Sequence, residues 1–268
     1  MTGLEGSGSR MDYLNSVLRW LHVIAGIMWI GHLYFFNFVN IRFAAAMKEA
    51  GVGKTTVPEL MPRALYWFRW GAAWTWLTGV LLLMLVFYHG GLMLEDPSSG
   101  WGAGAWVSLA ITFAGVFIYD ALYRSPLAAN ARNAGIAAFV LVAAAAVLMS
   151  TWGGLSYRAY SIHIGAMFGT AMAFNVWFRI WPAQKRIIAA TGAGAAPDPA
   201  DPALAGMRSR HNTFMSVPLV WMMIDQHTAA AGFASFGFFG VLAMVAIGWH
   251  LVWQFYRIST QDDRIKSF

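Results

Sequence analysis

The 268-residue chain contains no cysteine. It therefore forms no disulfide, and it has no thiolate to hold zinc, an iron–sulfur cluster or a covalently attached c-type haem. Charged residues are also scarce, at 11% of the sequence, whereas 59% of the residues are hydrophobic. A soluble globule of this size needs more polar surface than this composition supplies. The sequence therefore predicts an integral membrane protein in which any cofactor is held by His, Met, carboxylate or backbone groups.

Apolar runs of spanning length recur along the whole chain, and a bilayer core of ~30 Å requires about 20 such residues. They lie at residues 14–39, 65–88, 104–123, 134–152, 157–181, 207–230 and 232–256. The sequence therefore predicts an all-α, polytopic bundle of about seven transmembrane helices that forms one domain over residues 14–256. Residues 1–13 are predicted to be a flexible tail rather than a signal peptide, residues 185–206 a cytoplasmic linker and residues 257–268 a cytoplasmic tail. The sixth run contains Pro218, so either a continuous helix or a broken, re-entrant segment fits it.

Lysine and arginine gather on one side of the predicted bundle. All of them except Arg10, Arg19 and Arg158 fall in connections or helix ends that must share one face. Cytoplasmic connections are rich in these residues. The pattern predicts an outside N-terminus and a cytoplasmic C-terminus, which an odd number of spans allows. It also accounts for the net charge of +6 without a nucleic-acid partner.

Two histidines occupy matched depths in the outer part of the predicted bundle. Counting the helical rise places His22 ~12 Å inside the outer end of its helix, and His163 about two turns inside the outer end of its own. Gly26 and Trp29 share a helix face with His22, which leaves room for a flat ligand. Ionisable groups inside a membrane are costly and mark functional sites. His22 and His163 are therefore predicted to be axial ligands of an outer haem b, and the alternative is that each hydrogen-bonds a neighbouring helix.

A second, inner haem site is predicted from histidines nearer the cytoplasmic side. His211 and His250 are its main candidates, and His32 is a weaker one. His32 lies ~15 Å further along its helix than the outer histidine of that helix, so the two cannot ligate one iron. His227, at an outer helix end, is a weaker metal candidate, and an interfacial role is its alternative.

Copper is an alternative to haem, because soft ligands accompany two of the histidines. His163 is followed by Met167 at helical spacing, and Met222 and Met223 precede His227. These pairs fit a copper-handling membrane protein, and methionine also fills cores and faces lipid.

Polar residues also gather in the inner third of the predicted helices, namely Arg69, Asp120, Asn175 and Asn212. One interpretation is that they pair with one another. The other is that they line a pocket for a small anionic or amide-rich substrate, because Arg binds planar acceptors through two hydrogen bonds. In that interpretation Arg69 and Asn212 position a planar substrate and are the predicted catalytic residues.

Several runs of the sequence form a recognisable series. The longest are RWLHVIAGIMWIG (19–31), RWGAAWTWLTG (69–79) and HIGAMFGT (163–170). Shorter ones are NVWF (175–178), PAQ (182–184), APDP (196–199), RHNT (210–213) and DQH (225–227). In this order, over nearly the whole chain, they resemble the membrane domain of bacterial membrane-bound urate hydroxylases, the urate oxidase N-terminal domain family.

This resemblance implies an inner-membrane enzyme of bacterial purine catabolism. Enzymes of this kind oxidise urate to 5-hydroxyisourate and pass the electrons to a cytochrome c domain that is usually fused at the C-terminus. The family's histidines fall on His22, His163, His211 and His227. The sequence stops at Phe268 without a CxxCH motif, so we expect the cytochrome c or another redox partner on a separate polypeptide, or else a stand-alone membrane subunit. That departure leaves a second hypothesis, a non-catalytic electron-transfer or structural subunit of a larger respiratory or photosynthetic complex.

Overall fold

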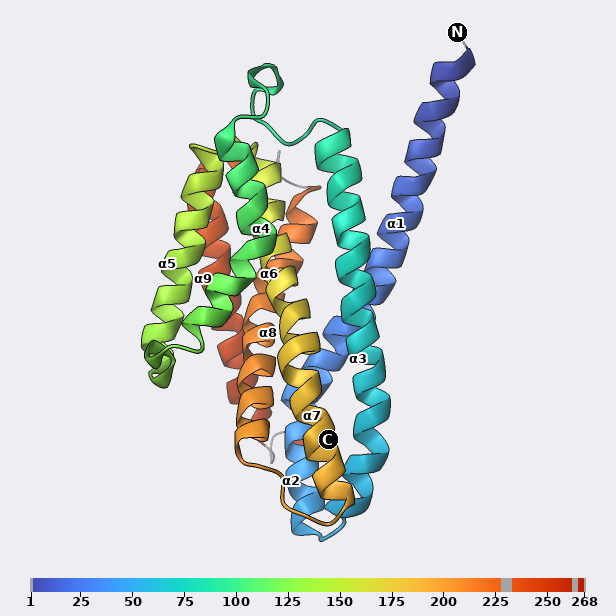
Figure 1. Ribbon diagram of the computed structural model, residues 1–268, viewed down its shortest axis with the longest axis vertical. Coiled ribbons are helices and arrows are strands. Elements are labelled where there is room, and N and C mark those ends of the chain that lie inside the picture. The colour runs from blue at the N-terminus through green and yellow to red at the C-terminus, as the bar shows by residue number, and fades with distance from the viewer. Residues whose placement is uncertain (1, 228–232, 262–264, 268) are drawn as a thin grey trace. The chain divides into compact units, whose positions relative to one another are not determined.

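Helices make up the protein, as the computed structural model in Figure 1 shows. The structure describes residues 2–227, 233–261 and 265–267, with side chains from residue 10 onward. The α-helices are α1 (Thr2–Tyr34), α2 (Ile41–Glu49), α3 (Gly53–Leu83), α4 (Ala103–Leu122), α5 (Ala131–Ser150), α6 (Tyr157–Asn175), α7 (Trp181–Gly192), α8 (Ala200–Asp225) and α9 (Gly237–Ser259). No strand occurs among the described residues, so the predicted all-α class is confirmed.

Five described stretches are long and apolar enough to cross a membrane. They are Arg10–Glu49, Gly53–His89, Ala103–Leu122, Ala131–Ser150 and Phe233–Ser259. The two other predicted spans fall on α6 and on α8, which have spanning length but carry more polar side chains. Residues 228–230 and 232 of the predicted spans, and residues 262–264 and 268 of the predicted tail, lie outside the described residues. The chain is a multi-pass membrane protein, and the sidedness of its ends stays a prediction.

Short π-helical segments join several α-helices into longer rods. They are η1 (Phe35–Asn40) between α1 and α2, η2 (Met84–His89) after α3, and η5 (Val176–Ile180) between α6 and α7. Because α1 begins at Thr2, residues 2–13 are helical where the sequence predicted a flexible tail. Likewise, α7 and α8 take up most of the predicted linker 185–206 and leave only residues 193–199 outside a long helix.

The sixth predicted span is a continuous helix through its proline. Pro218 lies inside α8, which runs on to Asp225. A methyl group built at Gly248 of α9 would come within 2.8 Å of Pro218 Cδ, so the absence of a side chain there lets α9 pack directly against the proline ring. Neighbouring helices commonly support a proline inside a membrane helix in this way.

The chain folds into two compact units. The first contains Met1–Trp20, Thr78–Ala171 and Pro218–Gly248, and the second contains Leu21–Leu77, Met172–Val217 and Trp249–Phe268.

In the first unit, the connection before α4 pairs with the connection before α6. Glu95 N donates to Gly154 O over 2.9 Å, and Ser156 N donates to Met93 O over 3.1 Å. These backbone bonds hold the start of α6 beside the loop that follows η2.

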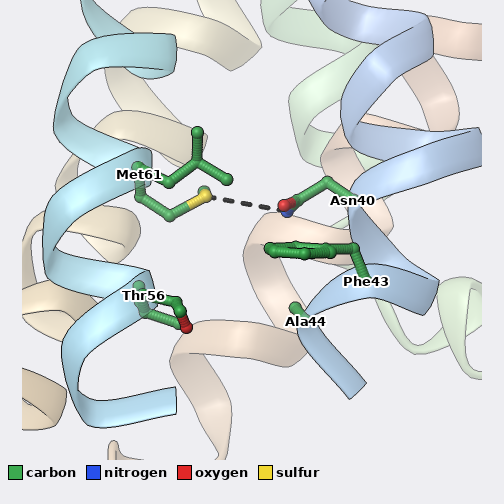
Figure 2. A pocket seen from close by; sticks show the side chains of 7 residues that line it. Asn40, Phe43, Ala44, Thr56 and Met61 are labelled. Carbon is green, nitrogen blue, oxygen red and sulfur yellow. Dashed lines mark hydrogen bonds between the residues drawn. The ribbon is translucent and has the colours of Figure 1, made fainter. Parts of the chain in front are cut away.

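In the second unit, α1 and α3 lie in close contact. A methyl group at Gly71 would lie 3.1 Å from the backbone nitrogen of Trp29, and the rings of Phe36 and Phe68 meet edge to face with centroids 5.3 Å apart. A small hollow of about 20 Å³ is lined by residues of η1, α2 and α3. Asn40 Nδ2 donates to Met61 Sδ there over 3.6 Å, the bond drawn as a dashed line in Figure 2. The size of the hollow suits about one water molecule rather than a substrate.

We expect the close helix approach in the first unit to depend on Gly104 of α4. A methyl group there would lie 2.1 Å from the carbonyl oxygen of Trp152, and backbone cannot move aside cheaply. Gly104→Ala should therefore lower the free energy of unfolding by about 1–3 kcal/mol. Thermal unfolding of the detergent-solubilised protein, followed by circular dichroism, measures the change.

Gly135 of α5 is the matched control, because nothing lies within 4 Å of a methyl group built there. Gly135→Ala should leave stability unchanged or raise it by up to about 1 kcal/mol, since alanine favours helix. Equal melting temperatures for the two variants would contradict this description of the packing.

Candidate functional site

His163, a predicted haem ligand in α6, is fully buried and uses both ring nitrogens. Its Nδ1 lies 2.6 Å from the carbonyl oxygen of Ala159, and its Nε2 lies 2.7 Å from the hydroxyl of Tyr88. A carbonyl can only accept, so the ring proton sits on Nδ1 and Nε2 accepts from Tyr88. An imidazole that binds a metal through Nε2 has the same tautomer. The Tyr88 hydroxyl therefore stands where a metal would bind.

His22, the other predicted ligand of the outer haem, is half-buried in α1 and hydrogen-bonds the backbone of Thr75 in α3. A methyl group at Gly26, one turn along, would touch only the Thr75 side chain, at 3.9 Å. Trp29, two turns along, is buried, and its indole nitrogen has no hydrogen-bond partner within the described part of the chain. His22 belongs to the second unit and His163 to the first. Their pairing at one haem stays a prediction.

The candidates for an inner haem site have separate surroundings. His211 is half-buried in α8 beside the guanidinium groups of Arg208 and Arg210. His250 is exposed on α9, where its Nε2 lies 3.2 Å from Gln254 Nε2. Their assignment to one inner site stays a prediction.

The two weaker metal candidates have protein partners as well. His32 is half-buried, with Nδ1 2.7 Å from the carbonyl oxygen of Met28, and exposed His227 lies 3.1 Å from an Arg19 nitrogen. Among the described residues, no group of three His, Asp or Glu side chains gathers around a common point.

The second unit contains a buried polar group built around two amides, those of Asn175 and Asn212, both of which the sequence analysis named as candidates. Asn175 Nδ2 donates to Asn212 Oδ1 over 2.8 Å, and Asn212 Nδ2 donates to the carbonyl oxygen of Met172 over 3.0 Å. Arg208, which is 1% exposed, donates to Asn175 Oδ1 over 3.4 Å. The Asn212 amide is thus engaged at both ends, and it fastens α8 to α6.

Sequence reasoning missed Arg208. It counted this arginine as one of the bases on the cytoplasmic face, although Arg208 lies one helical turn before Asn212 on the same face of α8. The i to i+4 spacing of a charged residue and an amide was the signal that could have found it.

Arg69 and Asp120, predicted together with the two asparagines, contact other residues. The Arg69 guanidinium lies 4.0 Å from the ring centre of Trp181 and 5.4 Å from that of Trp177, in a cation–π arrangement. Asp120 lies in the first unit, 3.7 Å from Arg124. Their assignment to one substrate pocket stays a prediction.

Another polar group lies where α6 begins and α8 ends, both within the first unit. We call Tyr157, Arg158, Ser161, Asp225 and Gln226 the α6–α8 cluster. Asp225 is 2% exposed and accepts a long hydrogen bond of 3.5 Å from the Ser161 hydroxyl, and the Tyr157 hydroxyl lies beside it.

Within the α6–α8 cluster, Gln226 Nε2 donates to two backbone carbonyls at 3.2 Å, those of Arg158 and Met222. Gln226 Oε1 and Arg158 Nε are buried and have no hydrogen-bond partner within the described part of the chain. Sequence reasoning missed both residues. One available signal was that Arg158 is one of only three bases placed off the cytoplasmic face.

A comparison with protein families assigns the chain. The family model described as urate oxidase N-terminal matches residues 8–56 and 52–267. The chain belongs to the urate oxidase N-terminal family. No curated protein and no solved structure matches it. Membership makes it a urate-related membrane protein, which agrees with the family resemblance of its sequence.

The imidazole nitrogens of His22 and His163 in this urate oxidase N-terminal protein are of a ligand type that binds haem iron. Each outer histidine has one ring nitrogen fixed by backbone, His22 by Thr75 and His163 by Ala159, as metal-bound imidazoles usually do. At His163 the Tyr88 hydroxyl would have to leave Nε2 for iron to bind. The copper alternative stays a prediction.

We expect Asn212 to stabilise the fold rather than to contact substrate. Asn212→Leu leaves the Asn175 amide and the Met172 carbonyl without their partner in a buried place, which costs about 1–3 kcal/mol. Asn133→Leu is the control, because that side chain is exposed on α5. Denaturation of both variants in detergent micelles tests this. An Asn212→Leu protein with unchanged stability and no urate turnover would instead support the catalytic role.

Proposed function

We propose that this protein is a membrane-embedded urate hydroxylase. In this reaction urate and water give 5-hydroxyisourate, two protons and two electrons, so the enzyme needs a binding site for a planar anion and a route for electrons. The observation that carries the proposal is the family match, which extends from residue 8 to residue 267. The matched region includes every candidate histidine.

The proposed electron route uses haem b in the bacterial inner membrane. His22 and His163 would hold the haem, and a second haem would draw on His211. Haem, when bound, supplies one-electron chemistry and a path to the electron acceptor, which we propose is a cytochrome c. The backbone partners of His22 and His163 support this assignment, because they set the ring orientation that a ligand needs.

The residues of the chain would bind and orient the urate and keep it apart from lipid. Arg69 is one candidate for holding it, because its guanidinium is planar and its Nε lacks a hydrogen-bond partner among the described residues. Trp181 already covers one face of the Arg69 guanidinium, so Arg69 would bind urate through the N–H groups at the edge of the guanidinium and not by stacking on it.

An absorption spectrum tests the cofactor. We expect the purified protein to show a Soret band that shifts on reduction with dithionite, and His22→Ala to lose or shift that band. His89→Ala is the matched control, because His89 is exposed at a helix end and belongs to no proposed site. Protein purified in full yield without porphyrin would overturn the haem assignment.

A turnover assay tests the reaction itself. The loss of urate absorbance in the presence of an oxidised cytochrome c should depend on the protein and match the reduction of the cytochrome. A haem-loaded protein that leaves urate unchanged would refute urate hydroxylation and favour the electron-transfer or structural subunit.

A further inference from the structure

Two buried polar groups of the protein, the Asn212 amide and the α6–α8 cluster, differ in how completely their hydrogen bonds are satisfied. In the second unit, the Asn212 amide bonds at both ends within the protein. In the α6–α8 cluster, an acceptor, Gln226 Oε1, and a donor, Arg158 Nε, are both buried without a partner among the described residues. A buried polar atom in this state costs about 1–3 kcal/mol, and native proteins rarely keep two together without a reason.

The position of the Gln226 amide is fixed from both helices. Its Nε2 donates to the carbonyl of Arg158 in α6 and to that of Met222 in α8. The side chain is 9% exposed, so it has little freedom to turn. Its oxygen therefore stays directed away from those two carbonyls, and the Arg158 side chain leaves the backbone right beside the amide.

Gln226 Oε1 and Arg158 Nε are an acceptor and a donor, and one kind of planar ligand presents the complementary pair. A lactam or ureide unit presents an N–H beside a C=O, and an unpaired amide oxygen with an unpaired guanidinium N–H offers one partner for each. The guanidinium also suits an anion, because charge-assisted hydrogen bonds are stronger than neutral ones. Urate is a planar anion whose rim consists of such units.

A neighbouring carboxylate adds a second acceptor. Asp225 is almost fully buried, and its one bond to a serine is long, the Ser161 hydroxyl lying 3.5 Å from its Oδ2. A carboxylate has about four acceptor positions, so Asp225 can accept a ring N–H in addition to the neighbouring Ser161 and Tyr157 hydroxyls.

Two residues at the cluster reach the surface. Arg158 is half-buried, and His227, which follows Gln226, is exposed and lies 3.1 Å from Arg19. The arginine stem has several rotatable bonds, so its guanidinium can swing to admit a ligand and close on it again.

We propose that Arg158 and Gln226 bind the lactam edge of the substrate, with Asp225 as a further acceptor. This inference rests on the proposed function for the identity of the substrate, urate, and names the place where that substrate binds. Arg158 donates to a ring carbonyl or anionic nitrogen, and Gln226 accepts from the adjacent ring N–H.

Equilibrium binding of urate to the full chain in detergent or nanodiscs tests the proposal. We expect Gln226→Met, which keeps the side-chain length and removes the amide, to raise the Kd roughly tenfold or more, because an unpaired substrate N–H is strongly rejected. Arg158→Gln should do the same. Gln254→Met and Arg124→Gln are the matched controls, since Gln254 is half-buried, Arg124 is exposed and neither belongs to the cluster, and they should leave the Kd unchanged.

Circular dichroism and the Soret band of each variant report whether it folds. If Gln226→Met unfolds the chain, the conservative Gln226→Asn keeps the amide but shortens its reach, and it should weaken binding while the helix content is retained. Folded cluster variants that bind urate as the wild type does would overturn the binding site while the proposed function stands.

A second probe separates the two proposals. Xanthine also presents lactam edges, so it should compete with urate at the cluster and lose affinity in the same variants. If the wild type neither binds nor oxidises urate but binds xanthine through Gln226, the lactam site stands and the urate function fails. Binding of neither compound to a folded wild-type protein would overturn the site.

Discussion

The structure depends on one constraint, which is that lipid offers no hydrogen bonds to a polar group. A donor or acceptor within the membrane must hydrogen-bond another group of the protein, because a polar group left without a partner there destabilises the fold. The buried amides obey this rule, since Asn175 bonds Asn212 and Asn212 bonds a backbone carbonyl. His163 obeys it too, with a carbonyl at one nitrogen and the Tyr88 hydroxyl at the other. Arg158 Nε and Gln226 Oε1 are exceptions to this rule, since both are buried without a partner among the described residues.

Helix α8 connects these observations along its length. Near its start it bears Arg208 and Asn212, which fasten it to α6 within the second unit. Another of its faces bonds α1 and η1, because the Ser216 hydroxyl pairs with Tyr34 and the Ser209 hydroxyl accepts from Asn37. Its end brings Asp225 to the first turn of α6.

Much of the fold follows from the sequence, because long apolar runs with few charges permit only helices in a membrane. The sequence does not predict that residues 2–13 and most of residues 185–206 are helical. The Gly, Ser, Pro and Ala residues of those segments weaken the helical pattern. Depth counting did predict that Asn175 and Asn212 lie at a common level. It could not predict that Gln226 bonds the backbone of Arg158, 68 residues away, since that contact depends on how two helices pack.

In our proposal urate binds where α6 begins and α8 ends, rather than at the buried amides of the second unit. Hydrogen–deuterium exchange of the full chain with and without urate tests this placement. We expect urate to slow exchange in peptides covering residues 155–163 and 222–227 and to leave residues 205–213 unchanged. Slower exchange in residues 205–213, with none at the ends of α6 and α8, would contradict it.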